Sequence, residues 1–172
     1  MYLLGKAIAF ATERHEGQYR RYDNEPYINH PLRVSETVRR ASLDREVIAA
    51  SILHDVVEDT DTTLEEISEI FGSNVAKYVD DMTDISKPED GNRKARLTID
   101  FAHTAQGHPI SKTIKIADVL DNLRDVYEKD PRYAQKYCRE KEVLLHQSLK
   151  EGNKMLWNEL LDLIEAIKDK TL

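Results

Sequence analysis

Apolar residues recur at intervals of three and four along most of this chain. That spacing places them on one face of an α-helix, whereas a half-buried strand would alternate apolar and polar positions. No stretch shows such alternation. The spacing predicts an all-α fold, a helical bundle of roughly eight helices, with helical segments near 3–11, 31–38, 47–57, 63–70, 73–82, 92–105, 111–127, 131–150 and 153–168.

The segment 47–57 is apolar on nearly every side, which is typical of a buried helix. Asp44 stands where an N-cap would begin this helix. We therefore expect it to be the central helix, with the other helices packed around it. Downstream, Thr62 and Glu65 have the spacing of a capping box, and Gly72 is placed to end the short helix that follows.

The composition is that of one globular domain, residues 1–172, with 40% hydrophobic and 33% charged residues. The net charge of −7 argues against binding to nucleic acid or an anionic membrane surface, since both need clustered positive charge. No apolar run approaches the ~20 residues that span a bilayer, and the first eleven residues read as a helix and not as a signal peptide. The only cysteine, Cys138, excludes an internal disulfide and favours a reducing cytoplasm. The oligomeric state does not follow from the sequence.

Ionisable residues interrupt the most apolar segment at His54-Asp55 and again at Glu58-Asp59. Burying such groups is costly unless they are paired or bind a metal. Residues four apart share a helix face, so Glu58 would lie one turn beyond His54, and Asp59 one turn beyond Asp55. This arrangement favours a metal site with further carboxylates near a bound water. A buried His–Asp hydrogen bond with two surface acids is the alternative.

Two other segments carry candidate ligands. His30, in the string PYINHP, stands at the start of a helix, and Asp118, in KIAD, lies on a second apolar helix. Taken singly, His30 could be a capping histidine, and Asp118 could be a buried acid paired with Lys115. His15, His103 and His108 have no spacing that suggests a role.

These segments together resemble a known family. The order His30, His54-Asp55, Asp118 is similar to the HD superfamily of metal-dependent phosphohydrolases. The strings HEGQYRR, PYINHP, LHDVVEDTDTT and KIADVLDNLRD resemble more closely the alarmone hydrolases, which comprise the hydrolase domains of RelA/SpoT-type enzymes and the small stand-alone hydrolases. The resemblance runs from about residue 7 to about residue 126.

The resemblance implies an HD-domain helical bundle that hydrolyses the 3′-diphosphate of guanosine tetra- or pentaphosphate, a small nucleotide, in the stringent response. It implies one Mn²⁺ ion bound by His30, His54, Asp55 and Asp118. A mixed nitrogen and oxygen ligand set suits such an ion, which would lower the pKa of a bound water. Because the chain is too short to include the synthetase domain of the bifunctional enzymes, we expect hydrolysis only.

The resemblance also assigns roles around the metal. Glu58 and Asp59 correspond to the acidic pair that orients or deprotonates the water. Arg20 and Arg21 correspond to a basic pair at the nucleotide, where guanidinium groups can stack on a base or bind phosphate. Asn122 corresponds to an asparagine that contacts the nucleotide.

Two positions depart from the family pattern. The residue after Asp118 is usually basic and here is Val119, and the residue before Asn122 is usually aromatic or histidine and here is Asp121. We expect both changes to lie on the nucleotide side. They keep open another substrate, such as the 2′-phosphate of NADPH or a nucleoside monophosphate. A regulatory module that binds a nucleotide without turnover is a third interpretation, which the intact Glu58-Asp59 pair disfavours.

Overall fold

The structure, a computed structural model, describes residues 2–169. Over that range the chain is all-α, as the hydrophobic spacing predicts, and its only β-type contact is an isolated bridge between Tyr19 and Pro26. No helix in this range is both long enough and apolar enough to cross a membrane. The helices are α1 (Leu3–Arg14), α2 (Asn29–Arg39), α3 (Arg45–Ile52), α4 (Val56–Asp59), α5 (Leu64–Phe71), α6 (Ser73–Asp80), the 3-10 turn η1 (Pro88–Asp90), α7 (Arg93–Gln106), α8 (Pro109–Lys129), α9 (Pro131–Ser148) and α10 (Lys154–Asp169).

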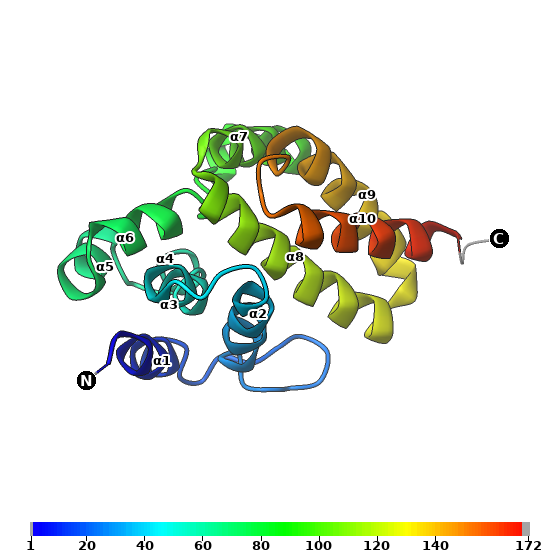
Figure 1. Ribbon diagram of the computed structural model, residues 1–172. Helices are drawn as coiled ribbons and strands as arrows, with labels where there is room; N and C mark the ends of the chain where they lie inside the picture. The colour runs from blue at the N-terminus through cyan, green and yellow to red at the C-terminus, as the bar shows by residue number, and fades with distance from the viewer. Residues whose placement is uncertain (1, 170–172) are drawn as a thin grey trace.

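Helix α8 is the central element of the bundle. It crosses the middle of the molecule, with α1, α2 and α3 on one side and α9 and α10 on the other (Figure 1). It packs against α2, α3, α6, α7, α9 and α10, whereas α3 packs mainly against α1, α2 and α6. The expectation that the segment 47–57 is central was wrong. The reason lies in α8, where Ile114, Ile116, Leu120 and Leu123 are fully buried around most of the helix.

The segment 47–57 is not one helix either. Helix α3 ends at Ile52, and a turn through His54 and Asp55 leads into the single turn of α4. The Nδ1 of His54 lies 2.9 Å from the carbonyl oxygen of Ser51, the acceptor that the N–H of Asp55 would use in a regular helix. A side chain thus takes the place of a backbone donor and breaks the helix at the two residues of greatest chemical interest. This break adds a helix to the number predicted.

The helix ends are largely as the sequence predicts. Asp44 caps α3 by accepting a hydrogen bond from the N–H of Glu46 at 2.8 Å. Gly72 ends α5 with a φ of 97°, a conformation that favours glycine. The capping box was placed one residue too early, because Thr63 and not Thr62 accepts from the N–H of Glu66. Thr62 is buried and contacts the hydroxyl of Thr60 instead.

Helix α10 provides a test of the core that lies away from the candidate chemistry. Leu160 is fully buried, while Met155 on the same helix is 46% exposed. We expect Leu160→Ala to lower the free energy of unfolding by about 2–5 kcal/mol, because it removes buried methyl groups and leaves a cavity. Met155→Ala is the matched control and should change it by less than about 0.5 kcal/mol. Urea denaturation of both variants checks this, and equal losses would contradict the burial of Leu160.

Candidate metal centre

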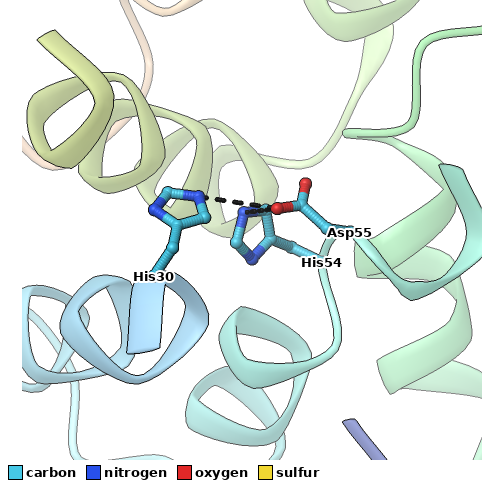
Figure 2. Close-up of side chains that lie close together, drawn as sticks. All are labelled: His30, His54 and Asp55. Atoms are coloured by element: carbon cyan, nitrogen blue, oxygen red, sulfur yellow. Dashed lines mark ion pairs between the residues drawn. The ribbon is translucent and has the colours of Figure 1, made fainter. Parts of the chain in front are cut away.

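Four side chains from three separate elements meet beside α8. His30 comes from α2, His54 and Asp55 from the turn between α3 and α4, and Asp118 from α8. The Nε2 of His54 lies 3.1 Å from Asp55 Oδ2 and 3.6 Å from Asp118 Oδ1. The Nε2 of His30 lies 3.5 Å and 3.2 Å from the same two oxygens. Figure 2 shows His30, His54 and Asp55 pointing toward one another.

Both imidazoles are anchored through Nδ1. The Nδ1 of His54 contacts the carbonyl of Ser51 at 2.9 Å, and the Nδ1 of His30 contacts Asp121 Oδ2 at 2.7 Å. Because these partners accept hydrogen bonds, each Nδ1 carries a proton, and Nε2 is the nitrogen that faces the shared space and offers a lone pair when the ring is neutral. Neutral histidine ligands in metal sites have this arrangement.

The two Nε2 atoms fit a bound cation better than a hydrogen-bonded pair. Both rings are buried, and neither Nε2 makes a hydrogen bond, although carboxylate oxygens lie close by. A buried polar atom without a partner costs free energy. A divalent ion between the two nitrogens and the carboxylates of Asp55 and Asp118 would satisfy all four groups. The residues present therefore fit the metal that the sequence predicts, and a simple buried His–Asp hydrogen bond does not describe them.

Neighbouring side chains orient the two carboxylates. The hydroxyl of Tyr27 donates to Asp55 Oδ2 at 2.8 Å, and the amide of Asn122 donates to Asp118 Oδ1 at 2.6 Å. Lys115 pairs with Asp118 Oδ2 at 3.5 Å, as the alternative interpretation of this aspartate expected. Lys115 thus balances one negative charge of the cluster. Tyr27, which sequence reasoning gave no role, stands in the same PYINHP string as His30.

Opposite charges control protonation in the cluster. Burial alone would lower the pKa of both histidines, but the neighbouring carboxylates raise the pKa of His54 to about 9 and that of His30 well above its ordinary value. Burial disfavours the charged carboxylates, yet His54 holds the pKa of Asp55 below its usual range, and Lys115 does so for Asp118. In the metal-free protein the two imidazoles therefore hold protons, and metal binding would release them.

The acidic pair lies at the end of α4. Glu58 and Asp59 are both exposed, as plain surface acids would be. Glu58 nevertheless accepts a hydrogen bond from the N–H of Asp84 at 3.3 Å. The protein around its carboxyl raises the pKa of Glu58 to about 7, with contributions from the charges of Asp84 and Asp55, despite the opposing effect of Lys115. Desolvation by the surrounding protein and the charge of Asp55 also raise the pKa of Asp59.

A cavity of about 320 Å³ adjoins the cluster on the side of Tyr27 and Asn122. The guanidinium of Arg20 donates to Asn122 Oδ1 at 2.9 Å and to Asp125 Oδ2 at 3.0 Å. Arg21 also lines the cavity, is exposed, and lies over the ring of Tyr22. The structure thus brings all three predicted nucleotide residues to one cavity. Sequence reasoning missed its aromatic walls, which include Tyr19, Tyr22, Tyr133 and Tyr137.

A second cavity, of about 390 Å³, is lined by Glu58. Two arginines from α7 line it. Arg93 forms a bidentate ion pair with Glu140, at 2.7 and 3.1 Å. The Nε of Arg96 is buried without a hydrogen-bond partner. Arg96 also lines this cavity and places a positive charge there.

The two departures from the family pattern do not lie where the sequence suggested. Val119 is 1% exposed within the core and lines neither cavity. Asp121 contacts Nδ1 of His30 in the candidate metal cluster, and it does not line the tyrosine cavity. The expectation that both changes touch the nucleotide side was wrong. Residues 119 and 121 flank Asp118 and Asn122 in sequence, but a helix turns adjacent residues about 100° apart.

The three histidines to which the sequence gave no role have local partners outside the candidate metal cluster. His15 pairs through Nδ1 with Gln18 at 2.8 Å, and its ring packs against Tyr27. His103 contacts the carbonyl of Asp80 at 2.8 Å. His108 caps α8, its Nδ1 accepting from the N–H of Ile110 at 3.2 Å. These contacts explain why no ligand spacing linked them to the predicted site.

The HD domain family matches residues 7–145. This chain is 41% identical over 131 residues to the human guanosine-3′,5′-bis(diphosphate) 3′-pyrophosphohydrolase MESH1, a match that covers 73% of this chain and 70% of that protein. It is 37% identical over 132 residues to the protein of the same name from Danio rerio, covering 75% of this chain and 72% of that protein.

Longer and solved relatives agree with this match. A guanosine-3′,5′-bis(diphosphate) 3′-pyrophosphohydrolase from Aquifex aeolicus is 39% identical over 122 residues, which make up 71% of this chain but 17% of that protein. A solved structure, reported as a metazoan ortholog of SpoT that hydrolyzes ppGpp, superimposes with a TM-score of 0.84 at 28% identity, covering 96% of each chain.

Proposed function

Because this chain belongs to the HD domain family, we propose that it is a metal-dependent hydrolase that removes the 3′-diphosphate of guanosine tetra- or pentaphosphate as pyrophosphate. The oxygen of a water molecule bonds to the phosphorus that is attached to the ribose 3′-oxygen. The bond between this phosphorus and the 3′-oxygen breaks, and the 3′-oxygen takes up a proton as it leaves. The products are GDP or GTP and pyrophosphate. This proposal rests on the Nε2 atoms of His30 and His54. Both are buried without a hydrogen bond, and both face the carboxylates of Asp55 and Asp118. We take residues 1–172 as one HD domain.

The metal would be Mn²⁺, bound by His30, His54, Asp55 and Asp118. Imidazole nitrogens and carboxylate oxygens without a thiolate suit an ion of intermediate hardness. Such an ion would polarise a phosphate oxygen and lower the pKa of a coordinated water toward neutrality. Tyr27 and Asn122 support the site because each donates a hydrogen bond to one of the two carboxylates.

Glu58 would act as the general base for the attacking water. Its carboxyl stands beside the cluster, and its pKa of about 7 suits proton transfer near neutral pH. Asp59, the last residue of α4, would orient the water. Its backbone carbonyl accepts a hydrogen bond from Gln18 at 3.0 Å, which ties α4 to the loop that carries the arginines.

The two cavities would divide the substrate between them. In the cavity lined by tyrosines, the guanine base would stack on an aromatic face or on Arg21, while Arg20 and Asn122 contact the ribose or a phosphate. In the cavity beside Glu58, Arg96 would bind a second phosphate group. Arg20 already pairs with Asp125, so substrate binding would exchange one of these contacts for a phosphate.

The cellular setting follows from the same family. We place the protein in a reducing cytoplasm, where its buried free Cys138 would stay a thiol. Degradation of the nucleotide there would take part in a stringent response to starvation. The altered pair Val119 and Asp121 keeps other substrates open, but neither residue lines the tyrosine cavity.

The experiment that tests this proposal uses protein stripped by a chelator and reloaded with Mn²⁺. With ppGpp we expect GDP and pyrophosphate, and turnover that returns only with the ion. A parallel panel contains NADPH and nucleoside monophosphates. Cleavage of a member of the panel without pyrophosphate release from ppGpp would contradict the substrate but keep the hydrolase. Binding of ppGpp with no turnover of any substrate would favour the regulatory module.

A further inference from the structure

A chain of three charged side chains stands behind the ligand His30. Asp121 Oδ2 lies 2.7 Å from His30 Nδ1. Arg33 donates two hydrogen bonds to the same carboxylate. Its Nε donates to Oδ1 at 2.8 Å, and its terminal nitrogen Nη2 donates to Oδ2 at 3.2 Å. The other terminal nitrogen of Arg33 donates to both oxygens of Glu25, at 2.7 and 3.0 Å. Both oxygens of Asp121 are therefore occupied in a fixed orientation.

The two histidine ligands are anchored differently. His54 uses the backbone carbonyl of Ser51, three residues away in its own turn, and needs no other side chain. His30 is completely buried, and its Nδ1 has no such local acceptor, because it contacts Asp121 on another helix. Asp121 lies three residues after Asp118, so α8 supplies one metal ligand and also the anchor of a second ligand that α2 carries.

We propose that Asp121 is a positioning residue of the metal centre, which accepts the Nδ1–H of His30 and so directs the Nε2 lone pair at the cation, while Arg33 fixes the orientation of Asp121. The inference rests on the proposed function, since it requires a cation at His30. A carboxylate behind a ligating histidine fixes the tautomer and the ring orientation, and its loss weakens metal binding by about 10- to 100-fold. An ion pair that only joins α2 to α8 would have no such effect.

Metal affinity separates these two roles. Titration of the metal-free protein with Mn²⁺, followed by the electron paramagnetic resonance signal of free Mn²⁺, gives the dissociation constant without any substrate. We expect Asp121→Ala to weaken Mn²⁺ binding by about 10- to 100-fold. Arg33→Ala breaks the same ion pair but leaves the acceptor for His30, so its loss should be clearly smaller. Asp121→Leu, which fills similar space without an acceptor, is the second variant if Asp121→Ala does not fold.

Glu128→Gln is the matched control. Glu128 is an exposed carboxylate on α8 that lines the same 520 Å³ surface cavity as Asp121 and Arg33, and its variant should bind Mn²⁺ like the wild type. Wild-type affinity in Asp121→Ala, or equal losses in Asp121→Ala and Arg33→Ala, would overturn the inference and leave the proposed function intact. A wild-type protein that binds no Mn²⁺ would overturn both.

Discussion

Replacing Asp55 by alanine is expected to lower the hydrolysis of ppGpp by at least about 10³-fold, since a catalytic metal ion supplies several kcal/mol of transition-state stabilisation. Asp55 Oδ2 is the oxygen closest to His54 Nε2, at 3.1 Å, and lies 3.5 Å from His30 Nε2. Without it, two imidazoles and one carboxylate would remain to hold the ion. Steady-state turnover at saturating Mn²⁺ measures the effect.

The control for this variant is Asp61→Ala, which removes an exposed aspartate six residues further on. It should retain wild-type turnover and Mn²⁺ affinity. Circular dichroism of the metal-free proteins checks that the loss of the Tyr27 hydrogen bond to Asp55 leaves the helices intact. Turnover by Asp55→Ala within tenfold of the wild type would show that Asp55 is not a ligand of a catalytic metal.

Sequence reasoning could single out the residues of the cluster because their chemistry conflicts with their surroundings. His54 and Asp55 stand in a run of Val, Ile, Leu and Ala, where buried ionisable groups need partners. The family strings then supplied His30 and Asp118, which the fold brings within 3.2 Å of each other. Hydrophobic spacing also predicts most helices, because each buries one apolar face against α8 or its neighbours.

What the sequence could not predict depends on contacts between distant segments. Asp121 and His30 are 91 positions apart in the sequence, and no local pattern predicts that they make contact. The break after Ile52 arises because the His54 side chain takes a backbone acceptor, while the apolar run continues through it. The tyrosine cavity likewise joins the loop around Tyr22 to Tyr133 and Tyr137 of α9, and helical spacing alone gave α9 no role.

Replacing Glu58 by glutamine is expected to lower turnover by about 10²- to 10⁴-fold, the usual contribution of a general base. The substitution keeps an oxygen that can accept from the N–H of Asp84, so the loop at Asp84 should stay in place. It removes the basic carboxylate beside the cluster. Mn²⁺ affinity should remain that of the wild type, because Glu58 is not among the four ligands. Turnover and Mn²⁺ titration on one preparation measure both quantities.

The pH profile decides whether Glu58 works as a base or as an acid. Desolvation of the carboxyl by the surrounding protein raises its pKa to about 7, and a nearby divalent cation would favour the carboxylate and lower that pKa. Since a base must be deprotonated, wild-type turnover should rise with pH and level off at or below about pH 7, and Glu58→Gln should lack this rise. Glu69→Gln, an exposed glutamate of α5, should keep it. Turnover that falls with rising pH in the wild type, but not in Glu58→Gln, would instead assign Glu58 to protonating the leaving 3′-oxygen.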